Sequence, residues 1–139
     1  MIKAVVDTNL IISGSISDKG APYKLLKAWE NKKFILLTTM EIINEAKGVL
    51  HYPKIKATYR LTEEDILNTV NSLLNDAAIV KGLYQVKKVK NDPTDDKFLG
   101  CALEGGASHV VSGDSHLLSL KTYHRIRIVR VNTFLKILE

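Results

Sequence analysis

Short apolar runs alternate with segments of helical periodicity along the chain. The runs that predict strands cover residues 2–6, 34–37, 77–80, 109–112 and 126–131. Helical spacing of apolar residues covers residues 10–13, 22–30, 95–104 and 117–120, and follows Thr38, Thr62 and Asn132 or Thr133. Residues 84–89 are expected to be extended. Continuous apolar strands that alternate with helices are typical of a parallel sheet with helices on both faces. The pattern therefore predicts an α/β fold.

Residues with strong helix-end preferences set the expected boundaries. Gly14 is expected to end the first short helix, so that residues 14–20 form a loop. Thr38 and Glu41 have the spacing of a capping box, which predicts a helix start. Pro53 is expected to end that helix, because the residue before a proline disfavours helical geometry.

Acidic residues stand at positions where a parallel sheet collects reactive groups. Asp7 directly follows the first apolar strand, and Asp114 follows the strand over residues 109–112. Asp95 begins a predicted helix, where backbone N–H groups favour an anion. Glu45 lies at the edge of a buried helix face. Because ligands bind outside the carboxyl ends of parallel strands, these acids are expected to converge.

Each of these acids also has a purely structural explanation. Asp95 suits a helix N-cap, and Asp114 suits a turn after Gly113. Glu45, taken singly, is typical of a partly exposed helix acid. Asp7 is the hardest to explain in this way, because a buried carboxylate is costly unless it is paired, hydrogen-bonded or bound to a metal. The ordered set of four acids therefore carries more weight than any member.

Four converging carboxylates would repel one another and raise each other's pKa. A divalent cation relieves that repulsion. Ligands that are oxygen atoms alone favour Mg²⁺ or Mn²⁺ over zinc. Such an ion typically binds phosphates and activates water, so the pattern indicates phosphoryl chemistry.

Composition and charge narrow the class of protein. The chain has 139 residues, of which 45% are hydrophobic and 25% charged, and we expect residues 1–139 to form a single domain. It lacks an apolar run of the roughly 20 residues that span a bilayer and a signal-peptide pattern, so a cytoplasmic protein is expected. The lone cysteine, Cys101, excludes an internal disulfide and a cysteine zinc cluster. A net charge of +5 suits a negatively charged partner such as a nucleic acid.

Four segments together resemble the PIN-domain family, and in particular its small VapC-like toxin ribonucleases. They are Val-Val-Asp-Thr-Asn at residues 5–9 and the segments at residues 38–45, 92–102 and 110–118. The resemblance implies a three-layer α/β/α sandwich with a central, mostly parallel sheet. It also implies metal-dependent endoribonuclease activity, a small antitoxin as partner and a homodimer.

Carried over position by position, the resemblance implies catalytic, metal-binding acids at four positions. These are Asp7, Glu45, Asp95 and Asp114. Asn9 matches a polar residue that orders the first carboxylate, and Ser112 would add a supporting hydrogen bond.

Two assignments have near neighbours that compete for them. Asp92 and Asp96 lie beside Asp95; spacing from the following helix favours Asp95, with Asp96 as an accessory or second-metal residue. Glu41 competes with Glu45, but its capping-box position explains it structurally. Lysines that would hold RNA phosphates form a wider set: Lys24, Lys27, Lys32, Lys33, Lys87, Lys88, Lys90 and Lys97.

Three rival functions remain beside the ribonuclease. A catalytically silent PIN-like fold would bind RNA or protein only. A haloacid-dehalogenase-type phosphotransferase would carry a second Asp where Asn9 stands. A flap-type DNA nuclease would need additional helices. RNA specificity is expected to lie in the loops around residues 14–22 and 53–62.

Overall fold

A computed structural model of the protein describes residues 1–84, 86 and 96–139. Its centre is a six-stranded sheet with the order β3-β2-β1-β4-β6-β5. All strand pairs are parallel except that of β5 with β6. The strands are β1 (Lys3–Val6), β2 (Ile35–Thr39), β3 (Ala78–Val80), β4 (His109–Val111), β5 (Thr122–Tyr123) and β6 (Ile126–Val129).

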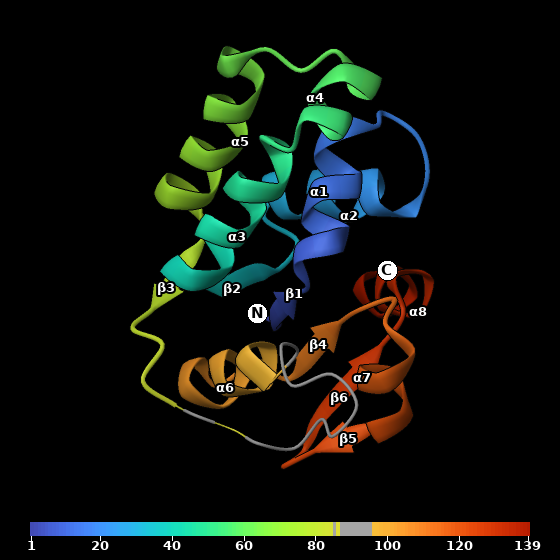
Figure 1. Ribbon diagram of the computed structural model, residues 1–139. Helices are drawn as coiled ribbons and strands as arrows, with labels where there is room; N and C mark the ends of the chain where they lie inside the picture. The colour runs from blue at the N-terminus through green and yellow to red at the C-terminus, as the bar shows by residue number, and fades with distance from the viewer. Residues whose placement is uncertain (85, 87–95) are drawn as a thin grey trace.

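Helices cover both faces of this sheet. In Figure 1, α1, α3, α4 and α5 lie on one side of the sheet and α6 on the other. The helices are α1 (Thr8–Ile16), α2 (Ala21–Glu30), α3 (Met40–Leu50), α4 (Pro53–Tyr59), α5 (Glu63–Asp76), α6 (Asp96–Gly105), α7 (Ser115–Leu120) and α8 (Val131–Leu138). The predicted α/β/α sandwich with a mostly parallel sheet is thereby confirmed.

The central strand β1 explains why the chain begins with an apolar run. Val5 pairs with Leu37 of β2 on one side and with Val110 of β4 on the other. All three are at most 3% exposed, because helices cover both faces. Burying each such side chain stabilises the fold by roughly 1.5–3 kcal/mol.

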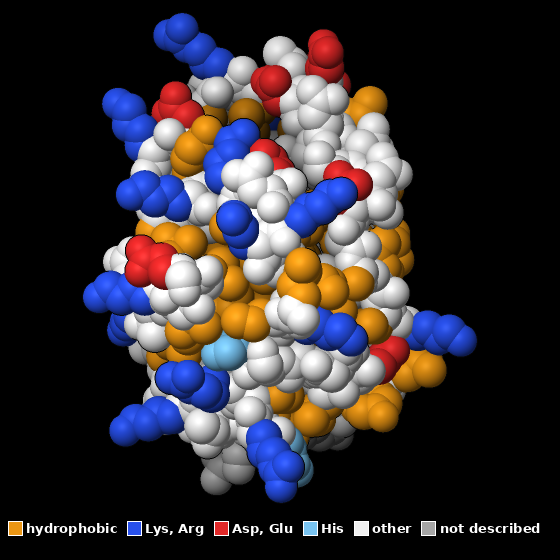
Figure 2. Space-filling model, turned by 180° about the vertical axis from the view of Figure 1, so that it is seen from behind, with side chains coloured by type: hydrophobic (Ala, Val, Ile, Leu, Met, Phe, Trp, Pro, Cys, Tyr) orange, Lys and Arg blue, Asp and Glu red, His pale blue; other side chains and the backbone are white. Residues whose placement is uncertain are grey.

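Figure 2 shows the surface on the opposite face of the molecule, where apolar side chains lie between scattered Lys and Arg.

The prediction that Gly14 ends the first helix was wrong. Helix α1 continues through Gly14 to Ile16, and the loop is shorter than expected. A Cβ atom at position 14 would lie 2.6 Å from the carbonyl oxygen of Pro22 and 2.7 Å from a methyl carbon of Leu26. Glycine therefore serves the close approach of α1 and α2, which sequence alone does not distinguish from a helix stop.

The expected boundaries around α3 also need correction. Its N-cap is Thr39, whose hydroxyl accepts a hydrogen bond from Ile42 N–H at 3.2 Å, whereas Thr38 is buried in β2. The capping box predicted from Thr38 to Glu41 is thus absent, and the exposed Glu41 lies in the first turn.

Residues 53–62, expected to be a loop, contain a further helix. Pro53 stands at the first position of α4, where its missing N–H costs nothing. Arg60 ends α4 in the left-handed conformation. The next helix, α5, begins with the capping box that Thr62 and Asp65 form.

The C-terminal elements differ from the prediction in two respects. Helix α8 begins at Val131 with Arg130 as its N-cap, not at Asn132 or Thr133. The short strand β5 was not predicted, and it forms a hairpin with β6. Most of the predicted extended stretch at residues 84–89 lies outside the described residues.

Candidate active site

Asp7 lies where β1 ends and α1 begins, and it is 4% exposed. As the N-cap of α1 it accepts a hydrogen bond from Leu10 N–H through Oδ1, at 2.9 Å. Its own N–H donates to the carbonyl of Val111, the last residue of β4, at 3.1 Å. The carboxylate is therefore placed between the ends of two neighbouring strands, as predicted for the carboxyl edge of a parallel sheet.

Ser112 connects Asp7 to the second acid of the site. This side chain is fully buried, and its hydroxyl donates to Asp7 Oδ2 at 2.5 Å. The Ser112 hydroxyl oxygen, Oγ, in turn accepts a hydrogen bond from the N–H of Asp114 at 3.0 Å. Gly113 N–H also donates to Asp7 Oδ2, at 3.3 Å. The expected supporting hydrogen bond of Ser112 is present in the structure.

Burial raises the pKa of the Asp7 carboxyl above its ordinary value. The hydrogen bonds from Ser112, Leu10 and Gly113 act against that rise, and the negative charge of Asp114 adds to it. Because burial outweighs the hydrogen bonds, the ionised carboxylate is under-compensated in the protein alone.

Asp114 caps α7 in the same way as Asp7 caps α1. Its Oδ1 atom accepts the N–H groups of His116 at 2.8 Å and Leu117 at 3.1 Å. The side chain is 31% exposed, so it is more accessible than Asp7. Both acids therefore act as helix N-caps, a role that the sequence suggested only for Asp95, and Asp114 Oδ2 has no hydrogen bond from any described residue.

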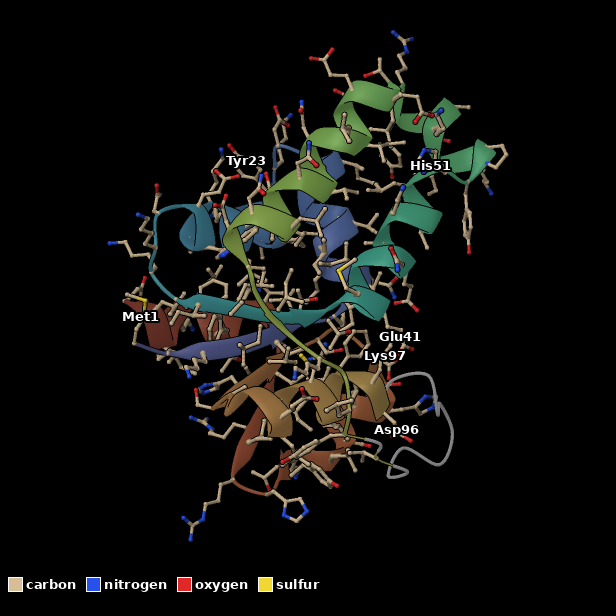
Figure 3. The ribbon with its side chains drawn as sticks, turned by 90° about the vertical axis from the view of Figure 1, so that its left-hand side faces the viewer. Met1, Tyr23, Glu41, His51, Asp96 and Lys97 are labelled. Carbon is tan, nitrogen blue, oxygen red and sulfur yellow. The ribbon has the colours of Figure 1, made fainter. Side chains whose placement is uncertain are left out.

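Glu45 reaches the same region from α3. Its Oε1 atom accepts a hydrogen bond from the hydroxyl of Thr8, the neighbour of Asp7. Its Oε2 atom pairs with Lys97 Nζ at 2.8 Å, and the Lys97 side chain is only 13% exposed. Figure 3 shows Lys97 and Asp96 at the start of α6, on the side of the molecule where Glu41 lies in the first turn of α3. Glu45 therefore contacts the site through two protein donors.

Thr8 is a site residue that sequence reasoning missed. It is 4% exposed and donates to Glu45 across 37 positions of the chain. The signal available was its position between Asp7 and Asn9. A hydroxyl in the first turn of a helix commonly serves the backbone, so its partner on α3 could not be read from the sequence.

The structure says less about the remaining predicted site residues, Asn9, Asp92, Asp95 and Asp96. Asn9 is exposed, and the described hydrogen bonds to the Asp7 carboxylate come from other residues, so its ordering role stays a prediction. Asp96 is 8% exposed in the first turn of α6. Asp95 and Asp92 lie outside the described residues. Within those residues, no three acids, histidines or cysteines form a group that could hold a metal ion.

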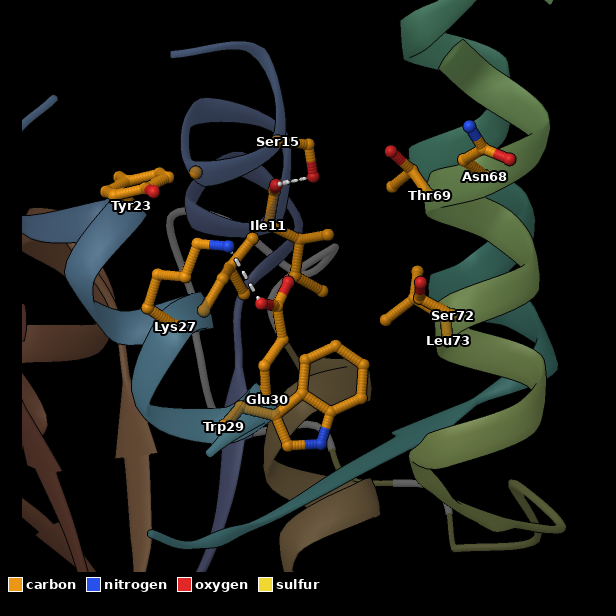
Figure 4. Close-up of a pocket in the computed structure, with 12 residues that line it drawn as sticks. Ile11, Ser15, Tyr23, Lys27, Trp29, Glu30, Asn68, Thr69, Ser72 and Leu73 are labelled. Carbon is orange, nitrogen blue, oxygen red and sulfur yellow. Dashed lines mark hydrogen bonds and ion pairs between the residues drawn. The ribbon is translucent and has the colours of Figure 1, made fainter. Parts of the chain in front are cut away.

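The predicted RNA-binding lysines on α2 lie at a separate pocket. Both Lys24 and Lys27 are exposed, and Lys27 pairs with Glu30 at 3.0 Å. Figure 4 shows Lys27 and Glu30 beside a pocket between α2, α1 and α5, with Ser15 and Thr69 across it. Lys87, Lys88 and Lys90 lie outside the described residues. RNA contacts by any of these lysines stay predictions.

The fold and the paired acids define a class of α/β proteins that place reactive carboxylates outside the carboxyl ends of parallel strands. Residues 3–116 match the sequence profile of the PIN domain. An uncharacterized protein of Methanocaldococcus jannaschii is 31% identical over 120 residues, which cover 86% of this chain and 76% of that protein. The chain belongs to the PIN-domain family. PIN domains are generally nucleases, and PIN nucleases typically use divalent metals.

No helix in the described part of the chain is long and apolar enough to cross a membrane.

Proposed function

We propose that this protein is a metal-dependent endoribonuclease that hydrolyses RNA phosphodiester bonds. The observation that carries the proposal is the buried Asp7 carboxylate beside Asp114, with the Ser112 hydroxyl bonded to both residues. Capping α1 uses only one oxygen of Asp7, and burial makes the ionised form of this carboxyl unfavourable, so stability alone does not explain the arrangement.

The donor set fits a hard divalent cation. Asp7 and Asp114 supply carboxylate oxygens and lie close enough for the charge of Asp114 to raise the pKa of Asp7. These two acids would hold Mg²⁺ or Mn²⁺, with Glu45 and Asp95 as the further ligands that we propose and Asp96 as an accessory. When bound, such an ion supplies Lewis acidity toward a phosphate and lowers the pKa of water.

The chain's own residues would fix the geometry of the reaction. Ser112 and the N–H of Gly113 hold one oxygen of Asp7, and the start of α7 orients Asp114. Lys97 and Thr8 keep Glu45 in place. Hydrolysis then adds water across one P–O bond, with the oxygen of water on phosphorus and its proton on the leaving ribose oxygen.

The RNA substrate and the biological role are the finer parts of the proposal. We propose a cytoplasmic toxin of a toxin–antitoxin pair, with a small antitoxin as partner and a homodimer as the assembly. The resemblance of the four segments to small VapC-like ribonucleases supports this role, and the net charge of +5 supports a polyanionic substrate. Induced expression should arrest the growth of a bacterial host, and the same induction of Asp7→Asn should not.

The direct test uses two substitutions and a matched control. Asp7→Asn and Asp114→Asn should each lower the rate of RNA cleavage in Mg²⁺ or Mn²⁺ by at least about 100-fold, because each removes a negative ligand. Asp76→Asn changes an exposed acid at the end of α5 and should cleave like the wild type. Circular dichroism should show an intact fold in all three. Full activity in either site variant would contradict the assignment.

One observation favours a second function, that of a catalytically silent RNA- or protein-binding module. Both carboxylate oxygens of Glu45 are engaged by Thr8 and Lys97. A wild-type protein that binds RNA with the same affinity in Mg²⁺ and in a chelator, and cleaves none, would establish the binding module instead.

A further inference from the structure

The positive charge of the chain is concentrated at its C-terminal end. Residues 115–139 contain five Lys or Arg residues and a single acid, Glu139, whereas residues 1–114 contain 15 and 14. Four of the five net charges therefore belong to the last 25 residues. This part of the chain forms α7, the β5–β6 hairpin and α8.

The β5–β6 hairpin carries basic residues at backbone positions that disfavour them. Its two-residue turn consists of His124 with φ +48° and Arg125 with φ +70°. Lys121, just before β5, has φ +61°. Turns of this kind strongly prefer Asn and Gly, because side chains with a Cβ are strained at positive φ.

Local packing explains the presence of His124 in the turn, but not that of Arg125. The rings of Tyr123 and His124 pack edge to face with centroids 4.5 Å apart, which stabilises His124 in the turn. No comparable contact of Arg125 is found among the described residues. A long cation therefore stands at a position where glycine would relieve strain.

The basic side chains of the hairpin face solvent. Lys121, Arg125 and Arg127 are all exposed, and none of them forms an ion pair with a described residue. Figure 2 shows Lys and Arg without Asp or Glu at the lower end of the molecule, the end where Figure 1 places β5 and β6. Among the described residues, the hairpin therefore presents a positive surface that no ion pair compensates.

The hairpin is directly connected to the candidate active site through the sheet. Strand β6 pairs in parallel with β4, whose end leads into Ser112 and Asp114. Arg127 stands opposite His109 at the start of β4, and the turn lies beyond it, away from the acids. The four residues of β6 span about 13 Å at roughly 3.3 Å per residue, a distance that a nucleic acid strand of a few nucleotides covers.

We propose that Lys121, His124, Arg125 and Arg127, here termed the basic hairpin, bind the phosphate backbone of an RNA strand that extends beyond the active site. This inference rests on the proposed ribonuclease function and adds a second contact surface to it. Phosphate contacts of this kind position a strand without reading its sequence. The basic hairpin would therefore favour long RNA over short RNA irrespective of sequence.

A structural explanation of the same residues makes a different prediction. Strand β5 is an edge strand, and charges on edge strands prevent pairing with other chains. That role would be met by Lys121 and Arg127 with an ordinary Asn-Gly turn between the strands. It does not account for the cation at position 125.

The first experiment measures RNA binding in a chelator, so that no cleavage occurs. Fluorescence anisotropy compares single-stranded RNA of 5 and 20 nucleotides, each at several salt concentrations. The triple variant Lys121→Ala, Arg125→Ala and Arg127→Ala should bind the 20-nucleotide RNA at least about tenfold more weakly, with a salt slope lower by about 2, at about 0.7 per lost contact.

A matched control removes the same charge elsewhere. The triple variant Lys47→Ala, Lys81→Ala and Lys136→Ala changes exposed lysines on three other parts of the fold. It should lower the salt slope much less than the hairpin variant does. Equal slopes in the two variants would overturn the inference, since net charge alone would then explain the loss.

A second variant separates RNA binding from stability. His124→Asn with Arg125→Gly installs the preferred turn, and it should raise the Tm while weakening binding of the 20-nucleotide RNA. A double variant that binds the 20-nucleotide RNA like the wild type would overturn the inference, and Lys121 and Arg127 would then serve only to protect the edge strand. If the wild type cleaves RNA but the hairpin variants bind it normally, only the hairpin inference fails; a wild type that neither binds nor cleaves RNA contradicts the proposed function itself.

Discussion

The environment of Asp7 shows how single residues turn a helix cap into a candidate site. Capping α1 requires only one acceptor, and Asp7 Oδ1 supplies it to Leu10 N–H. The second oxygen is held by Ser112 and Gly113, residues that follow a different strand. Capping is therefore a local function of Asp7 Oδ1. The contacts of Ser112 and Gly113 with Oδ2 are not needed for the cap, and they orient this oxygen in the candidate site.

Ser112→Ala tests that second set of contacts. The substitution removes the hydroxyl that donates to Asp7 and accepts from Asp114 N–H, at a position with no solvent exposure. Outer contacts of this kind are typically worth a factor of about 10–100 in metal affinity or activity. We expect losses in that range, measured by RNA cleavage and by calorimetric titration with Mn²⁺.

Ser119→Ala serves as the control for this substitution, because it removes an exposed hydroxyl on α7 that bonds only a local carbonyl. Unchanged Mn²⁺ affinity in Ser112→Ala would mean that the hydroxyl is structural only.

At the scale of elements, the close approach of α1 and α2 positions the start of α1. Gly14 lies against Pro22 and Leu26 of α2, and only a hydrogen atom fits between them. In the sequence alone, the same glycine predicts a helix stop. Glycine is compatible with both roles, and the difference lies in the packing of α1 against the next helix, α2.

Gly14→Ala should destabilise the protein by about 1–3 kcal/mol, because overpacking forces the two helices apart. Gly48→Ala is the matched control: it lies in α3, is exposed, and its added Cβ would meet no atom within 4 Å. That substitution should stabilise the protein by up to about 1 kcal/mol. Urea unfolding measures the free energy of unfolding of both variants. Similar changes in this free energy for Gly14→Ala and Gly48→Ala would contradict the packing role of Gly14.

At the scale of the whole molecule, the buried carboxylate of Asp7 makes stability depend on pH. Its pKa is higher in the folded protein than in the unfolded chain. The folded state therefore binds the proton more tightly, and stability falls as the pH rises through the raised pKa. A bound cation reverses this cost by stabilising the ionised form.

Asp7→Asn should consequently have a higher Tm than the wild type at neutral pH in a chelator. The difference should shrink as the pH falls below the raised pKa and vanish below the unfolded value near 3.8. Mg²⁺ or Mn²⁺ should raise the Tm of the wild type and leave that of Asp7→Asn nearly unchanged. Thermal melts between pH 3 and pH 8 measure both effects, and equal Tm shifts with metal would contradict them.

The sequence by itself determined the fold class and the positions of Asp7 and Asp114 at strand ends. Apolar runs such as residues 2–6 predicted buried strands because hydrophobic burial dominates folding, and Asp7 and Asp114 followed from their positions at strand ends. The Thr62 capping box was confirmed, since capping depends on neighbours only three residues apart.

Tertiary structure decided what depends on distant partners. It turned Gly14 into a packing contact, moved the cap of α3 to Thr39 and gave Thr8 its bond to Glu45. It also placed Lys121, Arg125 and Arg127 together at the β5–β6 hairpin, at the edge of the sheet. The physical reason is that local propensity and burial are encoded in short stretches, whereas contacts between elements, such as the bond of Thr8 to Glu45 across 37 residues, are fixed only when the elements pack.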